Sequence, residues 1–220
     1  MNLPATTLTD IKLGDLIVCI ESITNVDQLF EELLSKNPEH EDVKDERIPY
    51  WADLWPSAVA LSEYLLRSKI VQPGTKVLEL GCGLGLPGIV AGKVGAQVVF
   101  SDYLQGALDL AERNWKRNNN GIAEFVLMDW RNPLPGLNAE LIIASDIAYE
   151  KKSFNDLVSA FKTLLTPEGR MLIAEPNRAF AQSFFAELNQ HGFEVHSTLE
   201  KLNFRGQKYS VHLHMLKQKY

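Results

Sequence analysis

From residue 49 onward, short apolar runs alternate with stretches in which apolar residues recur at helical spacing. The apolar runs are typical of strands, because they contain many β-branched residues and are bounded by turn-forming residues. We expect strands at residues 76–80, 97–101, 123–128, 140–144, 169–174, 193–197 and 209–215. We expect helices at residues 57–67, 86–94, 105–116, 152–165 and 179–191. This alternation predicts an α/β fold with a mostly parallel sheet and helices on both faces.

The last two expected strands follow each other without an intervening helix, and residues 203–206 supply the turn between them. A hairpin at this point places one antiparallel strand in an otherwise parallel sheet. The strand cores are apolar throughout rather than strictly alternating, which agrees with burial on both faces of the sheet.

Residues 1–48 have a different pattern. Residues 16–20 predict a strand, and residues 26–34 predict a short helix with Asn25 as its cap. Residues 37–47 are dense in charge and predict a solvated loop, with a mobile flap over a site as the alternative. We therefore expect an N-terminal extension over residues 1–48, made of a strand, a helix and a charged loop, followed by one domain over residues 49–220.

The composition is that of an ordinary globular protein, with 45% hydrophobic and 23% charged residues in a chain of 220. The net charge is −6, so the chain lacks the basic surface that a phosphate backbone requires, and we expect no nucleic-acid partner. It shows neither a secretory signal nor an apolar run of about 18 residues, so we expect no membrane partner.

Neither the cysteines nor the histidines have the pattern of a disulfide framework or a metal site. Cys19 and Cys82 are too few for a disulfide framework and suit a reducing compartment, so we expect a cytoplasmic protein. His212 and His214 share one face of an expected strand, but no third ligand accompanies them, and we expect no metal.

A glycine-rich loop directly follows the expected strand at residues 76–80. Three of its glycines satisfy the spacing of the dinucleotide-binding fingerprint, namely Gly83, Gly85 and Gly88. Counted from Gly81, however, the first glycine after the strand, the sixth position is Leu86. Glu79 near the strand end would also repel a pyrophosphate. The loop therefore favours a cationic ligand without phosphate, such as S-adenosylmethionine, which carries an ammonium and a sulfonium group.

Acidic residues follow the next two strands. Asp102 ends the second expected strand of the domain, where an acid accepts hydrogen bonds from ribose hydroxyls in such folds. The alternative for Asp102 is a helix cap. Asp129 can accept from an adenine amino group, and Trp130 can supply a flat apolar wall. The alternative for this pair is a loop turn beside a core tryptophan.

Four further segments carry a resemblance to a known family. They are residues 49–58, which contain two tryptophans, residues 128–130, residues 145–150, and residues 175–178. With the glycine loop, they resemble the class I, seven-strand S-adenosylmethionine-dependent methyltransferases, and within these methyltransferase family 16. The match includes the D-x-x-Y signature at Asp146 and Tyr149. The first and last segments also resemble the branch that modifies the electron-transfer flavoprotein β subunit.

The resemblance implies a fold and a set of site residues. The implied fold is a Rossmann-like seven-stranded, mostly parallel sheet with helices on both faces and an antiparallel last strand. The residues implied around S-adenosylmethionine, together with those inferred above, are Trp55, Glu79, Gly81, Cys82, Gly83, Asp102, Asp129, Trp130 and Ser145. Asp146 and Tyr149 would face the methyl acceptor.

The family includes many protein lysine methyltransferases, so the expected reaction is methyl transfer to a lysine of a protein substrate that exposes it. A lysine has a reference pKa of about 10.4 and must lose a proton before it attacks. Asp146 would then anchor the amine and Tyr149 would orient it. Three alternatives stay open: a small-molecule N-methyltransferase with the N-terminal segment as a lid, a nucleic-acid amino methyltransferase, and a non-catalytic module that binds the cofactor.

Overall fold

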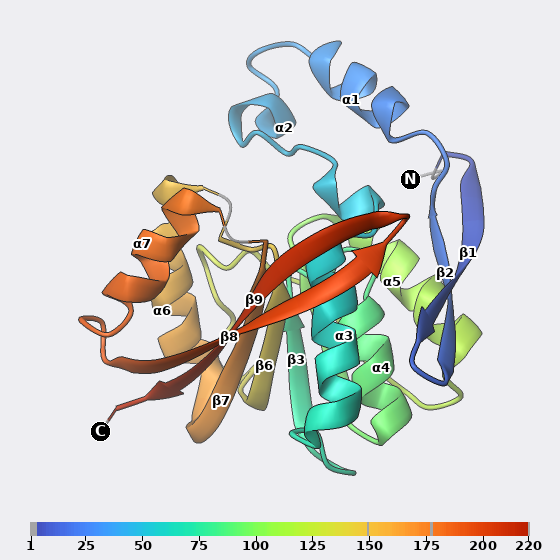
Figure 1. Cartoon of the computed structure of the whole chain (residues 1–220). Coiled ribbons are helices and arrows are strands. Elements are labelled where there is room, and N and C mark those ends of the chain that lie inside the picture. Colours follow the sequence, from blue (N-terminus) through green and yellow to red (C-terminus); the bar gives the residue numbers. More distant parts are fainter. Residues whose placement is uncertain (1–3, 149, 177, 220) are drawn as a thin grey trace.

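The computed structural model describes residues 4–148, 150–176 and 178–219, and within these ranges seven strands form one sheet (Figure 1). The strands are β3 (Lys76–Leu80), β4 (Gln97–Asp102), β5 (Glu124–Leu127), β6 (Ala139–Ser145), β7 (Leu165–Glu175), β8 (Phe193–Phe204) and β9 (Gln207–Gln218). Their order across the sheet is β5-β4-β3-β6-β7-β9-β8. The five strands from β5 to β7 in this order are parallel neighbours.

The last strand of the chain is antiparallel, as predicted. β9 pairs antiparallel with both β7 and β8 and lies between them. Both strands of this hairpin are longer than expected. The sequence pattern missed the residues near the turn at Arg205 and Gly206, because most of them are solvent-exposed and show little apolar alternation.

Helices cover both faces of the sheet. α3 (Pro56–Ser68), α4 (Leu86–Val94) and α5 (Gln105–Asn118) pack on one face, and α6 (Phe154–Leu164) and α7 (Ala179–Glu187) pack on the other (Figure 1). Successive strand residues point to opposite faces. Val77 thus joins the core under α3 and α4, whereas Leu78 joins the core under α6. A short 3₁₀ turn, η2 (Lys151–Ser153), precedes α6 where a longer helix was expected.

The N-terminal segment forms a hairpin rather than the single expected strand. β1 (Thr6–Leu13) pairs antiparallel with β2 (Leu16–Ile23), and α1 (Val26–Leu34) has the predicted bounds. Asn25 occupies the cap position of α1 but makes no side-chain capping bond. The alternation of buried Ile11 and Leu13 with polar neighbours is the signal that identifies β1.

Two asparagines of α5 hold the hairpin on the domain. Asn114 accepts from Glu21 N at 2.7 Å and donates to Glu21 O at 3.0 Å. Asn118 makes the same two contacts with Cys19, at 3.0 and 2.8 Å. A boundary after residue 48 remains a prediction, since this hairpin packs directly on the domain that follows.

The charged stretch is more ordered than a solvated loop. It contains the short helix α2 (Glu41–Lys44), which lies at the same end of the molecule as the carboxyl ends of the parallel strands (Figure 1). Asp45 pairs with Arg131 at 3.2 Å, and Glu46 pairs with Lys152. These ion pairs tie the stretch to the loops that follow β5 and β6. Among the described residues, no helix is long and apolar enough to cross a membrane.

The contact between α4 and α5 leads to a stability prediction. A Cβ at Gly92 of α4 would lie 2.3 Å from the buried ring of Trp115 on α5. Overpacking costs about 1–3 kcal/mol, whereas alanine gains only about 1 kcal/mol over glycine in helix propensity. We expect Gly92→Ala to lower the free energy of unfolding in urea by about 1–2 kcal/mol. The same change in a Trp115→Leu background should cost less; equal losses in both backgrounds would contradict the contact.

Candidate functional site

A cavity of about 460 Å³ opens at the carboxyl ends of β3, β4 and β6. This is the edge of a parallel sheet where ligands bind in open α/β folds. Eight of the predicted site residues line it, and they are Trp55, Gly81, Cys82, Gly83, Asp102, Trp130, Ser145 and Asp146. Glu79 and Asp129 do not line the cavity. Tyr149 lies outside the described residues.

The glycine loop follows a path that only glycine adopts readily. Gly81, Gly83 and Gly85 have φ of 66°, 49° and 77°, in the left-handed region that side chains disfavour. A Cβ at Gly81 would also approach the side chain of Ile147 to 3.1 Å and the ring of Trp130 to 3.3 Å. The loop therefore brings its backbone directly to the cavity wall.

Glu79 joins the strand before the glycine loop to the helix after it. Its side chain is buried, and Oε2 accepts from Gly88 N at 2.9 Å, at the start of α4. A Cβ at Gly88 would lie 2.5 Å from that oxygen and 2.4 Å from the ring of Phe100. Gly88, the third glycine of the apparent dinucleotide fingerprint, therefore has a structural reason to be glycine, because any side chain there would clash with Glu79 and Phe100. A direct contact of Glu79 with a cofactor remains a prediction.

Asp102 is the acid best placed to meet a ligand. It ends β4 with its side chain nearly buried, and its two oxygens accept from Gly83 N and Leu104 N, each at 3.1 Å. Because Leu104 is the N-cap residue of α5, Asp102 also supports the start of that helix. A carboxylate has about four lone-pair sites, so both oxygens retain capacity for ligand hydroxyls. Burial raises the pKa of Asp102 to about 6.

Asp129 is engaged outside the cavity. Its oxygens accept from Arg131 N at 2.9 Å and Arg131 Nε at 2.7 Å, and Arg131 also contacts Asp45. The hydrogen bonds that Arg131 donates to the carboxylates of Asp129 and Asp45 raise the pKa of Arg131. Trp130, the next residue, does line the cavity beside Tyr103, with ring centroids 6.3 Å apart.

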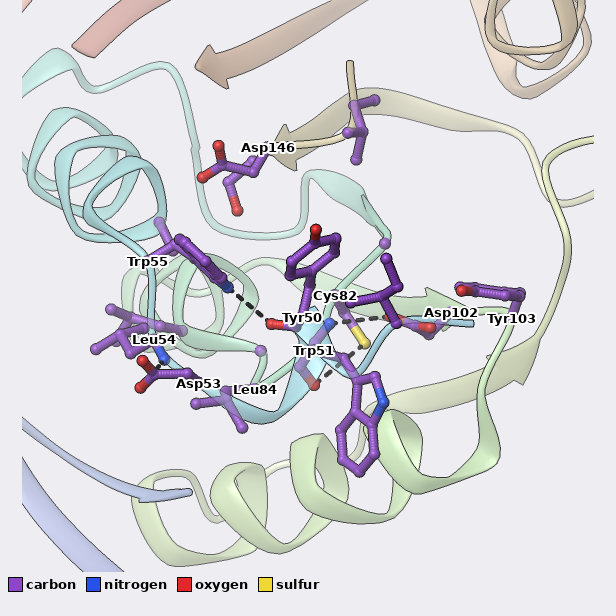
Figure 2. A pocket seen from close by; sticks show the side chains of 18 of the residues that line it. Tyr50, Trp51, Asp53, Leu54, Trp55, Cys82, Leu84, Asp102, Tyr103 and Asp146 are labelled. Atoms are coloured by element: carbon purple, nitrogen blue, oxygen red, sulfur yellow. Dashed lines mark hydrogen bonds between the residues drawn. The ribbon is translucent and has the colours of Figure 1, made fainter. Parts of the chain in front are cut away.

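Aromatic residues of the 49–55 segment form another wall of the cavity (Figure 2). Of these, Trp55 was a predicted site residue, whereas Tyr50 and Trp51 were not. Trp55 Nε1 donates to the carbonyl oxygen of Tyr50 at 2.7 Å, and the two rings meet edge to face at 5.9 Å. The backbone of Trp51 lies 3.4 Å from the position of a Cβ on Gly83. Tyr50 and Trp51 belong to the motif over residues 49–58, which could have identified them as cavity residues. For Tyr103, the sequence contained no indication other than its position directly after Asp102.

Asp146 occupies the end of β6 in an unusual backbone conformation. Its φ is 57°, in the left-handed region, and its N–H donates to Ala174 O at 2.9 Å. Its Oδ1 accepts from Arg178 Nη1 at 2.8 Å, while Oδ2 is buried without a hydrogen-bond partner among the described residues. Burial raises the pKa of Asp146, and the charge of Arg178 opposes that rise. Arg178, which also lines the cavity, was not among the predicted site residues.

The charges that line the cavity decide what it can hold. Four carboxylates line it, those of Asp53, Asp102, Asp146 and Glu150, and Arg178 is the one cationic side chain among the described lining residues. Because Arg178 is paired with Asp146, no free cation is available for a phosphate in the described part of the wall. Asp53 and Glu150 are paired with Arg205 and Lys152, so Asp102 is the lining carboxylate without a cationic partner among the described residues. The arrangement fits a cationic ligand with hydroxyl groups. Among the described residues, no cluster of three metal-ligating side chains occurs.

Comparisons with known proteins agree with this geometry. A family model described as lysine methyltransferase matches residues 40–191. The chain is 34% identical over 118 residues to a Homo sapiens protein named histone-arginine methyltransferase METTL23, covering 51% of this chain and 62% of that protein. It is 31% identical over 157 residues to the electron transfer flavoprotein beta subunit lysine methyltransferase of Danio rerio, covering 66% of this chain and 55% of that protein. The chain thus matches less than two thirds of the length of each.

A solved structure has the same fold. It is the magnesium protoporphyrin IX methyltransferase from Synechocystis PCC 6803 with bound S-adenosylmethionine, at a TM-score of 0.58 and 15% identity, covering 89% of this chain and 92% of that chain. At this identity the likeness concerns the fold, and it confirms the predicted Rossmann-like seven-stranded architecture.

The buried Glu79 carboxyl leads to a prediction about pH and stability. Burial raises its pKa well above the usual value, so the folded chain keeps a proton that the unfolded chain releases above about pH 4.3. The stability contributed by this proton is therefore lost as pH rises toward the folded-state pKa. Glu79→Gln keeps an oxygen for Gly88 N but cannot ionise. We expect its stability relative to the wild type to increase from about pH 5 to about pH 8.

Urea unfolding at both pH values measures this difference. The exchange Glu112→Gln on α5, where the partly exposed glutamate pairs with Lys116, is the control and should show no such trend. A constant difference between Glu79→Gln and the wild type would mean that Glu79 keeps an ordinary pKa.

Proposed function

The chain belongs to the lysine methyltransferase family, methyltransferase family 16, and from this premise we propose that it transfers a methyl group from S-adenosylmethionine to a lysine of a protein. The observation that supports this best is the cavity, where the wall residues present carboxylates and the one described cation is already paired with Asp146. Such a wall suits a ligand that carries an ammonium and a sulfonium but no phosphate.

The predicted cofactor, S-adenosylmethionine, agrees with the family, and the residues present fit it. Asp102 would accept the ribose hydroxyls, since its oxygens keep free lone pairs at the cavity wall. The ring of Trp130 would lie against the adenine, and the backbone of Gly81 and Gly83 allows close approach. When bound, the cofactor supplies a methyl group on a positively charged sulfur.

The protein's own contribution to the reaction is mainly positioning. In-line displacement requires the acceptor nitrogen, the methyl carbon and the leaving sulfur to lie on one line. We place the acceptor at the end of β6, where Asp146 would accept an N–H of the amine. Tyr149 would orient the same amine, a role that rests on the D-x-x-Y motif alone. The aromatic rings of Tyr50 and Trp55 lie on the cavity wall and would help to exclude water from the reacting groups.

Lysine is the acceptor that the family description favours, and the named relatives act on proteins. The human relative is named for arginine and the zebrafish relative for lysine. An acceptor amine in a small molecule would use the same aspartate, so acceptor size is a matter for experiment. Both cysteines are free thiols, which fits the proposed cytoplasmic location.

Cofactor binding should depend on Asp102. Replacing it by Asn removes a charged acceptor of hydrogen bonds, each worth about 1.5–3 kcal/mol, so S-adenosylhomocysteine should bind roughly 10- to 150-fold more weakly in calorimetry. Because the pKa of Asp102 is about 6, wild-type affinity should also fall as pH drops through that value, and the variant should lack this dependence. Asp109→Asn on α5, outside the cavity lining, is the control. Unchanged affinity in Asp102→Asn would remove Asp102 from the cofactor site.

The acceptor class is tested with methyl-labelled S-adenosylmethionine and a cell extract. We expect label in protein, recovered on lysine after complete hydrolysis. Asp146→Asn should abolish labelling while its affinity for S-adenosylhomocysteine changes little. Label on arginine or histidine would correct the acceptor residue. Label confined to small metabolites would replace protein methylation by the small-molecule alternative.

A further inference from the structure

Arg178 stands out as the one described cation that lines the cavity, and it lies on the loop after β7 rather than in the D-x-x-Y motif. Its backbone is held in place, because Arg178 N donates to Oε2 of Glu175 at 3.0 Å. Its guanidinium then reaches Asp146 Oδ1 at 2.8 Å through Nη1 alone. The contact joins the ends of β6 and β7 across the acceptor side of the cavity.

Building on the proposed function, we propose that Arg178 is a positioning residue that neutralises the charge of Asp146 in the acceptor subsite, so that the subsite receives the acceptor amine in its uncharged form. Asp146 paired with a guanidinium carries no net charge. A lysine that reaches this pair gains less from remaining an ammonium than it would beside a lone carboxylate. The second oxygen, Oδ2, is buried, and the hydroxyl of Ser57 on α3 is the neutral donor on this side of Asp146, so the carboxylate keeps lone pairs for one N–H of the neutral amine.

The surroundings of Asp146 explain why the guanidinium is needed. The other charged groups near Asp146 are acidic, Glu175 at the end of β7 and Glu150 on its own loop. The hydroxyl of Ser57 on α3 also lowers the pKa of Asp146 by hydrogen bonding, but it carries no charge. Burial raises the pKa of Asp146, and Arg178 is the cation that counters this. Without Arg178, Asp146 would either hold a proton and become a weaker acceptor of an N–H, or remain charged and hold the amine as an ammonium. Both outcomes move activity to higher pH.

The test is a pH–rate profile of kcat/KM for the wild type, Arg178→Gln and Arg178→Lys, with a protein substrate identified by labelling. We expect Arg178→Gln to shift the rising limb upward by about one pH unit or more, which is about tenfold less activity at neutral pH and recovery at high pH. Arg178→Lys keeps the charge and should keep the wild-type limb. Arg67→Gln, which breaks the surface pair of Arg67 with Glu200, is the control and should leave the profile unchanged.

A second readout does not depend on turnover. Carbon-13 NMR of labelled aspartate carboxyls, with Asp146 assigned through Asp146→Asn, should show a higher pKa for Asp146 in Arg178→Gln than in the wild type. A loss of activity that is equal at every pH, or an unchanged pKa of Asp146, would overturn the proposal. The two experiments separate failure of this proposal from failure of the proposed function. If the chain does not methylate proteins, the wild type will label no protein, but the NMR experiment will still measure the effect of Arg178 on the pKa of Asp146.

Discussion

The hydrogen bond from Gly88 N to Glu79 joins the end of β3 to the first turn of α4, and the site is built on it. A buried carboxyl is tolerated only when it is hydrogen-bonded, and here its partner is a free N–H at a helix start. The same stretch of β3 is tied to β4, because Ser101 Oγ donates to Glu79 O and Cys82 N donates to Ser101 O. These bonds fix where the glycine loop leaves the sheet, and thus where the cavity opens.

Carboxylates are the main charged groups of the cavity wall, and their partners are of two kinds. Asp102 is held by backbone N–H groups, Asp146 by Arg178, and Asp53 by two bonds from Arg205 at the turn between β8 and β9. Backbone donors carry no net charge, so Asp102 leaves the wall negative where a cationic cofactor would bind. A guanidinium cancels the charge of Asp146, at the side of the cavity where we propose that the acceptor binds. The two aspartates therefore differ in electrostatic character although both line the cavity.

The segment that precedes α3 connects the N-terminal extension to this wall. Tyr50 and Trp55 pack against each other, and the Asp53–Arg205 pair joins the segment to the last hairpin of the sheet. The charged stretch before it is joined to the opposite rim through Asp45–Arg131 and Glu46–Lys152. Surface ion pairs are individually weak. Their position matters more than their strength, because they join the stretch that contains α2 to the loops that carry the cavity residues Trp130 and Glu150.

The sequence alone determined the fold class and the succession of strands and helices along the domain, because local apolar patterns and glycines report on local backbone structure. β3, α4 and α1 have the predicted bounds, and Asp102 and Asp146 lie at the cavity as their positions after strands implied. Only the tertiary structure decided where side chains point and which distant charges meet. Glu79 faces Gly88 instead of the cavity, and Arg178 reaches Asp146 from the next strand end. Such pairings depend on register and packing between elements far apart in the chain, which no local pattern encodes.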